Sequence, residues 1–288
     1  MGDVGFLRRD ALTLTTDFAR EGFVVARGVL AAPEVARLRA DALRGLERGA
    51  VPFALGTTVP NAAVECPEVG WIFHHPAILE LVREALGDSD ILFTMEAAVQ
   101  RNLTSGWHKD TGAGHMSGGY YGCDDPFARD DCRVLKVGIY LQPHVDGRGL
   151  RVRRGSQTSP GLDDGEEVVL QTHSGDVVLF DVRLTHSGQV PERSDRAVAK
   201  VARVLPRSVR QRLVAVARRA VNRVSGRPDR LAVFFAFGPN VPATETYAIR
   251  NLAREHEQTG RFVSMLDPEL CGAFRAEGVE LLAACEAP

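Results

Sequence analysis

The stretch that decides the fold is ILFTMEAAVQRNL, residues 91–103, where a helical sequence pattern gives way to a β-rich one. The segment before it, HPAILELVREALG at residues 75–87, has a proline near its start and a glycine at its end. These two signals predict a helix over Pro76–Leu86. After residue 91 the chain consists mainly of short β-rich runs between turn residues. We therefore expect an all-β core with flanking helices.

Further runs downstream share this β-rich character. They are RVLKVGIYLQPH (133–144), GLRVRRGS (149–156), EEVVLQTH (166–173), DVVLFDVRLTH (176–186) and RLAVFFAFG (230–238). Many short strands separated by glycine-containing turns are typical of a closed or two-sheet β architecture. We assign this core to about residues 91–240 of a single domain that spans residues 1–288.

Helices are expected on both sides of the core. The segment 16–49 predicts a helix, a short strand and a second helix, with regularly spaced apolar positions in the second helix at Val35, Leu38, Ala42 and Leu46. N-terminal helices thus occupy about residues 1–90, and a helical tail occupies about residues 241–288. Residues 197–227 carry arginines around an apolar stripe at helical spacing, which indicates a basic helical insertion between two strands.

The composition excludes several classes of protein. The chain has 35 basic and 37 acidic side chains and a formal net charge of -2, so no overall field attracts a nucleic acid. No apolar run approaches the roughly 18 to 20 residues that span a membrane, and the first residues lack the apolar core of a signal peptide. The five cysteines form no C-x-x-C pair, which argues against a zinc ribbon or a disulfide framework. We expect a cytoplasmic protein with no membrane and no nucleic acid partner.

The segment SGWHKD, residues 105–110, points most directly to chemistry. In an extended segment, His108 and Asp110 are two residues apart, so their side chains leave the same face and can bind one ion. A third ligand has to come from elsewhere, and the candidate is His186, which follows the apolar run VVLF at residues 177–180. Two histidines and one carboxylate on one face of an octahedral ion leave three positions open, the arrangement of non-haem Fe(II) oxygenases.

These two segments, with GLRVRRGSQ at residues 149–157 and the opening FAREGFVVARGVLAAPEVARLRA at 18–40, resemble the phytanoyl-CoA dioxygenase family of Fe(II)/2-oxoglutarate-dependent oxygenases. The resemblance runs from about residue 18 to 238. It implies a double-stranded β-helix of the jelly-roll, cupin-like type in which His108, Asp110 and His186 bind Fe(II). It also implies 2-oxoglutarate as co-substrate and molecular oxygen as oxidant, with hydroxylation or oxidative cyclisation at an unactivated C–H bond of the substrate.

The resemblance further implies a basic residue that holds the far carboxylate of 2-oxoglutarate at the start of a strand after the distal histidine. Arg196 has approximately the usual spacing, ten residues after His186, whereas Arg230 precedes the better strand, and we prefer Arg230. Gln100 and Asn102 are expected to donate hydrogen bonds to the co-substrate. Lys136 is a further candidate for a carboxylate of co-substrate or substrate, with an internal ion pair as the alternative.

Substrate contacts are expected from the glycine-rich loop that follows the H-x-D segment, because loops on a rigid rim often carry recognition. The candidates are His115 and Tyr120 on this loop and Trp107 beside the first ligand, for which simple packing is the alternative. The polar rim favours a small polar metabolite, with a sugar-containing natural product in a biosynthetic pathway as one class. Two rival interpretations stay open: a non-catalytic, metal-binding, cupin-like sensor or binding protein, and a metal-free β-sandwich module with the three ligands far apart. The oligomeric state is left open.

Overall fold

The computed structural model describes residues 11–53, 56–144, 149–188, 229–259 and 265–282, together with residues 200, 213, 216–217, 219–220 and 223–224. The helices are α1 (Ala11–Glu21), α2 (Ala32–Gly49), α3 (Ala62–Glu65), α4 (Gly70–Phe73), α5 (Pro76–Leu86), α8 (Pro242–Thr259) and α9 (Pro268–Ala276). Single 3-10 turns are η1 (Pro67–Val69), η2 (Pro126–Ala128) and η3 (Ser156–Thr158). The strands are β1 (Phe23–Ala26), β2 (Val51–Phe53), β3 (Gly56–Pro60), β4 (Ile91–Arg101), β5 (Leu135–Tyr140), β6 (Arg151–Arg154), β7 (Glu166–Val169), β8 (Val177–Asp181), β9 (His186–Ser187), β10 (Leu231–Pro239) and β11 (Val279–Leu281).

The strands form two sheets. The larger sheet has the order β1-β8-β5-β10-β4-β3-β2, with antiparallel neighbours throughout. Strand β11 joins it by pairing in parallel with β4. The smaller sheet has the order β7-β6-β9. The larger sheet ends at β1 on one side and β2 on the other, so it does not close on itself.

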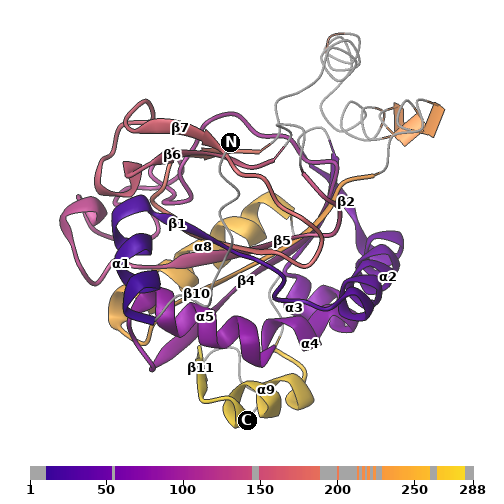
Figure 1. Cartoon of the computed structure of the whole chain (residues 1–288), viewed down its shortest axis with the longest axis horizontal. Helices are drawn as coiled ribbons and strands as arrows, with labels where there is room; N and C mark the ends of the chain where they lie inside the picture. Colours follow the sequence, from indigo (N-terminus) through magenta and orange to yellow (C-terminus); the bar gives the residue numbers. More distant parts are fainter. Residues whose placement is uncertain are drawn as a thin grey trace.

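The two faces of the larger sheet pack against different layers, because successive side chains along a strand point to opposite faces. One set of side chains joins the core beneath the helices: Val137, Ile139, Val177, Leu179, Val233 and Phe235. The intervening set packs with Leu150, Val152 and Leu170 from the region of the smaller sheet: Tyr140, Val178, Phe180 and Ala232. The smaller sheet therefore covers the face that the helices leave open, and β6 and β7 lie on the side away from α5 in Figure 1.

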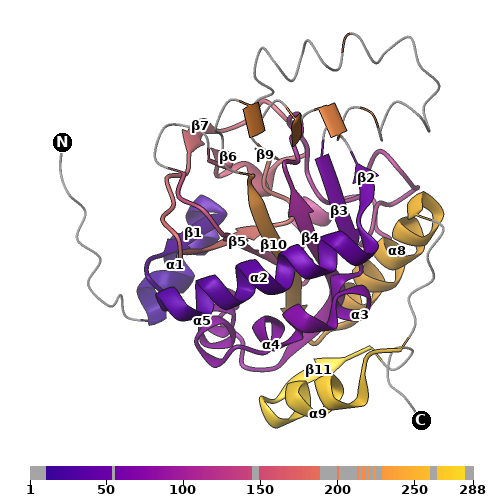
Figure 2. The same ribbon diagram turned by 90° about the vertical axis from the view of Figure 1, so that its right-hand side faces the viewer.

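The N-terminal helices cover the other face. Helices α2 and α5 lie across the larger sheet in Figure 2, and their buried side chains belong to the same core as the sheet. The predicted helix over Pro76–Leu86 is confirmed with these bounds, and all four predicted apolar positions of α2 are buried. Among the described residues, no helix is long and apolar enough to cross a membrane.

The prediction of a double-stranded β-helix with flanking helices is confirmed, with two additions. Strands β2 and β3 lie within residues 1–90, where only helices and one strand were expected, and they extend the sheet beyond β4. The predicted helical tail from about residue 241 contains α8 and α9, and the short strand β11 follows α9. Most of the predicted insertion at 197–227 lies outside the described residues, and the described positions within it are helical.

Candidate metal centre

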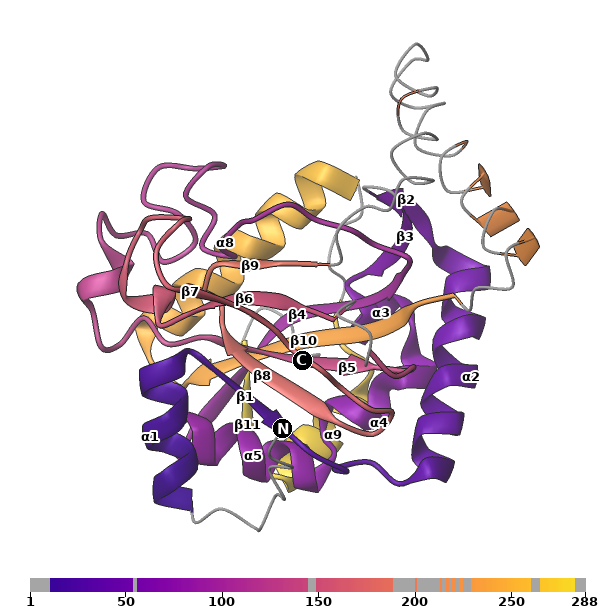
Figure 3. The same ribbon diagram turned by 45° about the horizontal axis from the view of Figure 1, so that its top comes forward.

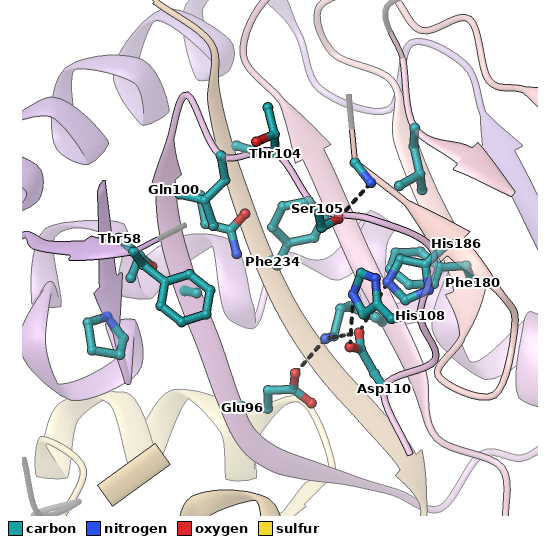
Figure 4. Close-up of a pocket in the computed structure, with 18 of the residues that line it drawn as sticks. Thr58, Glu96, Gln100, Thr104, Ser105, His108, Asp110, Phe180, His186 and Phe234 are labelled. Atoms are coloured by element: carbon teal, nitrogen blue, oxygen red, sulfur yellow. Dashed lines mark hydrogen bonds and ion pairs between the residues drawn. The ribbon is translucent and has the colours of Figure 1, made fainter. Parts of the chain in front are cut away.

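Strand pairing brings the three candidate ligands together. The backbone N–H of His108 donates to the carbonyl of His186 at 3.0 Å, and the reverse bond is 2.9 Å long. The N–H of Asp110 donates to the carbonyl of Val182 at 2.8 Å. One ligand atom from each of the three side chains lies within 4.8 Å of the others, as Figure 4 shows. This convergence excludes the interpretation in which the three residues lie far apart.

Each histidine is oriented by a backbone carbonyl. Nδ1 of His108 lies 2.8 Å from the carbonyl oxygen of Gly106, and Nδ1 of His186 lies 3.0 Å from that of Leu184. Because a carbonyl only accepts, the hydrogen-bond network assigns the proton to Nδ1 in both rings. The Nε2 atoms lie 3.5 Å (His108) and 3.4 Å (His186) from the two oxygens of Asp110. The Nε2 atoms of both rings thus face the carboxylate, which leaves these two nitrogens for metal ligation.

The charge states also fit a divalent cation. Burial would raise the pKa of Asp110, but the nearby Lys136 and His186 outweigh burial and hold this pKa well below its ordinary value. Burial, followed by the neighbouring His186, lowers the pKa of His108. An ionised carboxylate beside the Nε2 atoms of two imidazoles is the donor set expected for Fe(II) with open coordination positions. The residues present therefore fit the iron centre that the sequence predicts.

A buried lysine supports the carboxylate from behind. Nζ of Lys136 lies 2.6 Å from Oδ2 of Asp110 and 2.5 Å from Oε1 of Glu96 (Figure 4). The hydroxyl of Tyr247 donates to Glu96 at 3.0 Å and lies 3.1 Å from the carbonyl of Asp110. Of the two partners expected for Lys136, the structure thus shows the internal ion pair. Sequence reasoning missed both Glu96 and Tyr247.

The local backbone explains how Glu96 reaches this position. Phe235 and Phe237 of β10 are two residues apart, whereas their partners in β4, Ala97 and Phe93, are four apart. The extra residues form a bulge in which Met95 adopts a φ of 63°. Bulges of this kind often re-aim side chains near functional sites. Glu96 and Gln100 are four residues apart in β4, which is two repeats of the strand alternation. This spacing was the only feature of the sequence that could have placed Glu96 on the same face as Gln100.

A cavity of about 670 Å³ opens beside the three ligands. Every predicted site residue that the structure describes lines it: Gln100, Asn102, Trp107, His108, Asp110, His115, Tyr120, Lys136, His186 and Arg230. Gln100 and Thr58 lie in the part of the cavity away from the ligands in Figure 4. The predicted alternative Arg196 lies outside the described residues.

One part of the cavity combines an arginine with polar aromatic groups. Arg230 immediately precedes β10, and its charge acts on the nearby Tyr140 and His144, which also line the cavity. Burial, followed by the charge of Arg230, lowers the pKa of His144 to about 4. The side-chain amide of Asn102 accepts from the N–H of Arg230 at 2.9 Å and donates to Asp229 at 2.7 Å. Asn102 therefore fixes the backbone at the start of β10, next to Arg230 on the cavity wall.

The three candidate substrate contacts differ in their surroundings. The ring of Trp107 lies 4.6 Å from the guanidinium carbon of Arg151 and 4.8 Å from that of Arg153, which is the packing role considered for it. His115 is exposed on the loop. Tyr120 is buried, and a Cβ atom on Gly112 would come within 2.4 Å of its ring, so the loop needs glycine there.

Helix α8 contributes cavity residues that the sequence analysis did not identify. Asn251, Arg254 and Glu255 line the cavity beside Tyr120. Burial, followed by the charge of Glu96, raises the pKa of Glu255 to about 7. No local motif marks these positions, because their place in the site depends on how the C-terminal helix packs.

Comparisons with known proteins agree with this geometry. The sequence model of the family described as phytanoyl-CoA dioxygenase matches residues 18–196. No curated protein matches the chain.

Several solved structures share the fold. The epimerase SnoN from nogalamycin biosynthesis is 18% identical, with 80% of this chain and 82% of that chain covered and a TM-score of 0.56. The carbocyclase SnoK from nogalamycin biosynthesis is 16% identical, with coverage of 79% and 83% and a TM-score of 0.54. HygX from Streptomyces hygroscopicus, solved with nickel, 2-oxoglutarate and hygromycin B, is 18% identical, with coverage of 81% and 88% and a TM-score of 0.55. At such identities these structures establish similarity of fold.

Proposed function

The chain belongs to the phytanoyl-CoA dioxygenase family of Fe(II)/2-oxoglutarate-dependent oxygenases, and from this premise we propose that it oxidises a C–H bond of a small polar metabolite at the His108–Asp110–His186 site. The observation that carries this proposal is the convergence of two imidazoles and one carboxylate at the wall of a large cavity. The ligand set leaves coordination positions open on the cavity side, which suits both co-substrate and oxygen.

We assign the remaining roles from position and charge. Bound iron, with 2-oxoglutarate and oxygen, supplies the oxidising chemistry and yields succinate and carbon dioxide. Arg230 would hold the far carboxylate of 2-oxoglutarate by a bidentate contact, and Tyr140 would close the same end of the cavity. The protein then has to orient the target C–H bond and exclude water, which the enclosing sheets and helix α8 support.

A natural product is the substrate class that we propose. Proteins of similar fold come from nogalamycin biosynthesis or were solved with hygromycin B. Polar side chains such as Gln100, Asn251 and Glu255 line the cavity here. Hydroxylation and oxidative cyclisation use the same ligands, and both belong to this proposal. A cytoplasmic location is also proposed, supported by the reduced thiols of Cys66, Cys123 and Cys132.

Anaerobic reconstitution tests the metal site directly. Wild-type protein with Fe(II) and 2-oxoglutarate should develop a weak visible charge-transfer band and, on exposure to oxygen, release succinate. Asp110→Ala should remove the band, whereas Glu257→Gln, an exposed change on α8, should retain it. If the protein binds iron but releases no succinate when natural-product extracts are added as a source of substrate, the non-catalytic alternative is favoured. Failure of folded wild-type protein to form the band would contradict the proposed function.

A further inference from the structure

Helix α8 connects the metal centre to a second region of the cavity. It packs along β4 (Figure 3), and the hydroxyl of Tyr247 reaches both Glu96 and the backbone of Asp110. Asn251 and Glu255 follow Tyr247 by four and eight residues, so they lie on the same face of the helix. They are about 6 Å and about 12 Å further along its axis. The helix thus presents side chains at increasing distance from the ligands.

The groups that α8 presents combine donors and acceptors. Oδ1 of Asn251 accepts from Arg254 at 3.0 Å. Its Nδ2 is buried and has no hydrogen-bond partner among the described residues, although Asn251 lines the cavity. Glu255 adds a carboxylate that lies 3.9 Å from Arg254. A buried polar atom without a partner is unfavourable, so the site favours a ligand that satisfies the amide.

The charged groups in this region already pair with one another. Lys136 lies between Glu96 and Asp110, and Arg254 lies beside Glu255. A strongly charged ligand would disturb this pairing at a buried site. A hydroxyl group both donates and accepts, so neighbouring hydroxyls can accept from Asn251 and donate to Glu255 without adding charge.

We infer that Asn251, Arg254 and Glu255 form a subsite for a hydroxyl-rich ring of the substrate, such as a pyranose with vicinal hydroxyl groups. This inference rests on the proposed function and assigns the position of the polar part of the substrate. The cavity of about 670 Å³ falls within the range that encloses a small-molecule ligand, and so leaves space for such a ring. Binding at α8 would leave an adjoining part of the substrate facing the metal ligands.

A pair of matched probes tests the subsite. Protein loaded with Ni(II) and 2-oxoglutarate is titrated with methyl α-D-glucopyranoside and with 2-methoxytetrahydropyran, which has the same ring without the hydroxyls, and binding is followed by ligand-observed NMR. The glucoside should bind and the hydroxyl-free ring should not. Asn251→Asp keeps the acceptor for Arg254 but removes the free donor, and Glu255→Gln removes the charge. Each should weaken glucoside binding about tenfold, while Glu257→Gln should not.

The outcomes separate the inference from the proposed function. Equal binding of both probes, no glucoside binding by the wild type, or equal affinity in all variants would each overturn the subsite. The Fe(II)/2-oxoglutarate band is measured for the same proteins. If the band forms in every variant and the α8 substitutions leave the glucoside affinity unchanged, only the subsite inference is wrong. If the band is absent in the wild type, the proposed function fails.

Discussion

The ammonium of Lys136 lies 2.6 Å from Oδ2 of Asp110, so a fixed positive charge shares the carboxylate with the candidate metal position. This leaves Oδ1 as the oxygen next to Nε2 of His108. The same ammonium neutralises Glu96. Lys136 thus allows two carboxylates to lie close together at this site.

Replacing Lys136 by Met should make folding depend on the metal. Without the ammonium, two carboxylates remain close together in a buried site, and the metal-free protein should lose about 3 kcal/mol of stability. A divalent cation then replaces the missing charge, so Ni(II) should raise the melting temperature more in the variant than in the wild type. Thermal denaturation with and without Ni(II) measures this difference. Lys136→Arg keeps the charge and should behave like the wild type; an equal metal effect in all three proteins would contradict the role of Lys136.

Arg230 immediately precedes β10 and lies near Tyr140 and His144 in the cavity. Its proposed contact with 2-oxoglutarate gives a second prediction. Arg230→Met should weaken 2-oxoglutarate binding by about 100-fold, the effect of losing a charge-assisted contact to a carboxylate. Fe(II) binding should change little, because Arg230 is not among the three ligands. Titration of the visible band with 2-oxoglutarate at saturating Fe(II) separates the two affinities.

Arg196 is the matched control for this experiment. Arg196→Met should leave the 2-oxoglutarate titration unchanged if Arg230 holds the far carboxylate. The assignment is wrong if Arg196→Met abolishes saturation while Arg230→Met does not. Saturation in both variants would contradict both arginine assignments.

The core strands could be predicted because their sequence reflects their environment. β8 is buried on both faces, between the helices and the smaller sheet, and its run VVLF is continuously apolar as a consequence. β2 and β3 were missed because Pro52 and Pro60 interrupt an already short pattern. Pro52 is tolerated because β2 is an edge strand, and Pro60 is the last residue of β3. β11 was missed because its three residues acquire strand geometry only by pairing with β4.

The site was predictable only where local spacing encodes geometry. The two-residue spacing of His108 and Asp110 was enough to pair them, although the structure has an isolated bridge at His108 and a turn at Asp110 where a strand or its end was expected. His186 could be proposed because it follows a clear strand, although its backbone pairing with His108 is a long-range contact. The position of Glu96 depends on a bulge in β4, and the position of Glu255 depends on how α8 packs against β4. A local sequence pattern predicts neither of these features.

His144 makes acid stability testable. Its buried imidazole accepts from the side-chain amide of Gln142 at 3.1 Å and lies near Arg230, and its pKa falls from 6.5 to about 4. As the pH drops below 6.5, His144 binds a proton in the unfolded protein but stays neutral in the folded protein. The free energy of unfolding therefore decreases as the pH falls to about 4. The loss is on the order of 3 kcal/mol, at about 1.4 kcal/mol per pKa unit. His144→Gln should avoid it.

Chemical denaturation of the metal-free protein across this pH range measures the effect. The exposed His115→Gln variant is the control and should follow the wild-type curve. If His144→Gln also follows that curve, His144 takes up its proton equally well in the folded and unfolded states, contrary to its buried position.

Glu255 should produce the opposite slope over nearly the same range. Burial and the charge of Glu96 raise its pKa from 4.5 to about 7, despite Arg254 and Lys136 nearby. Between these values the folded carboxyl keeps a proton that the unfolded one has released, so stability falls as the pH rises. The effect is on the order of 3 kcal/mol and should vanish in Glu255→Gln, with Glu257→Gln as control. Because the raised pKa of Glu255 opposes the lowered pKa of His144, the stability of Glu255→Gln should rise more steeply than that of the wild type from pH 4.5 to 7. Parallel curves for Glu255→Gln and Glu257→Gln would rule out a proton held at Glu255.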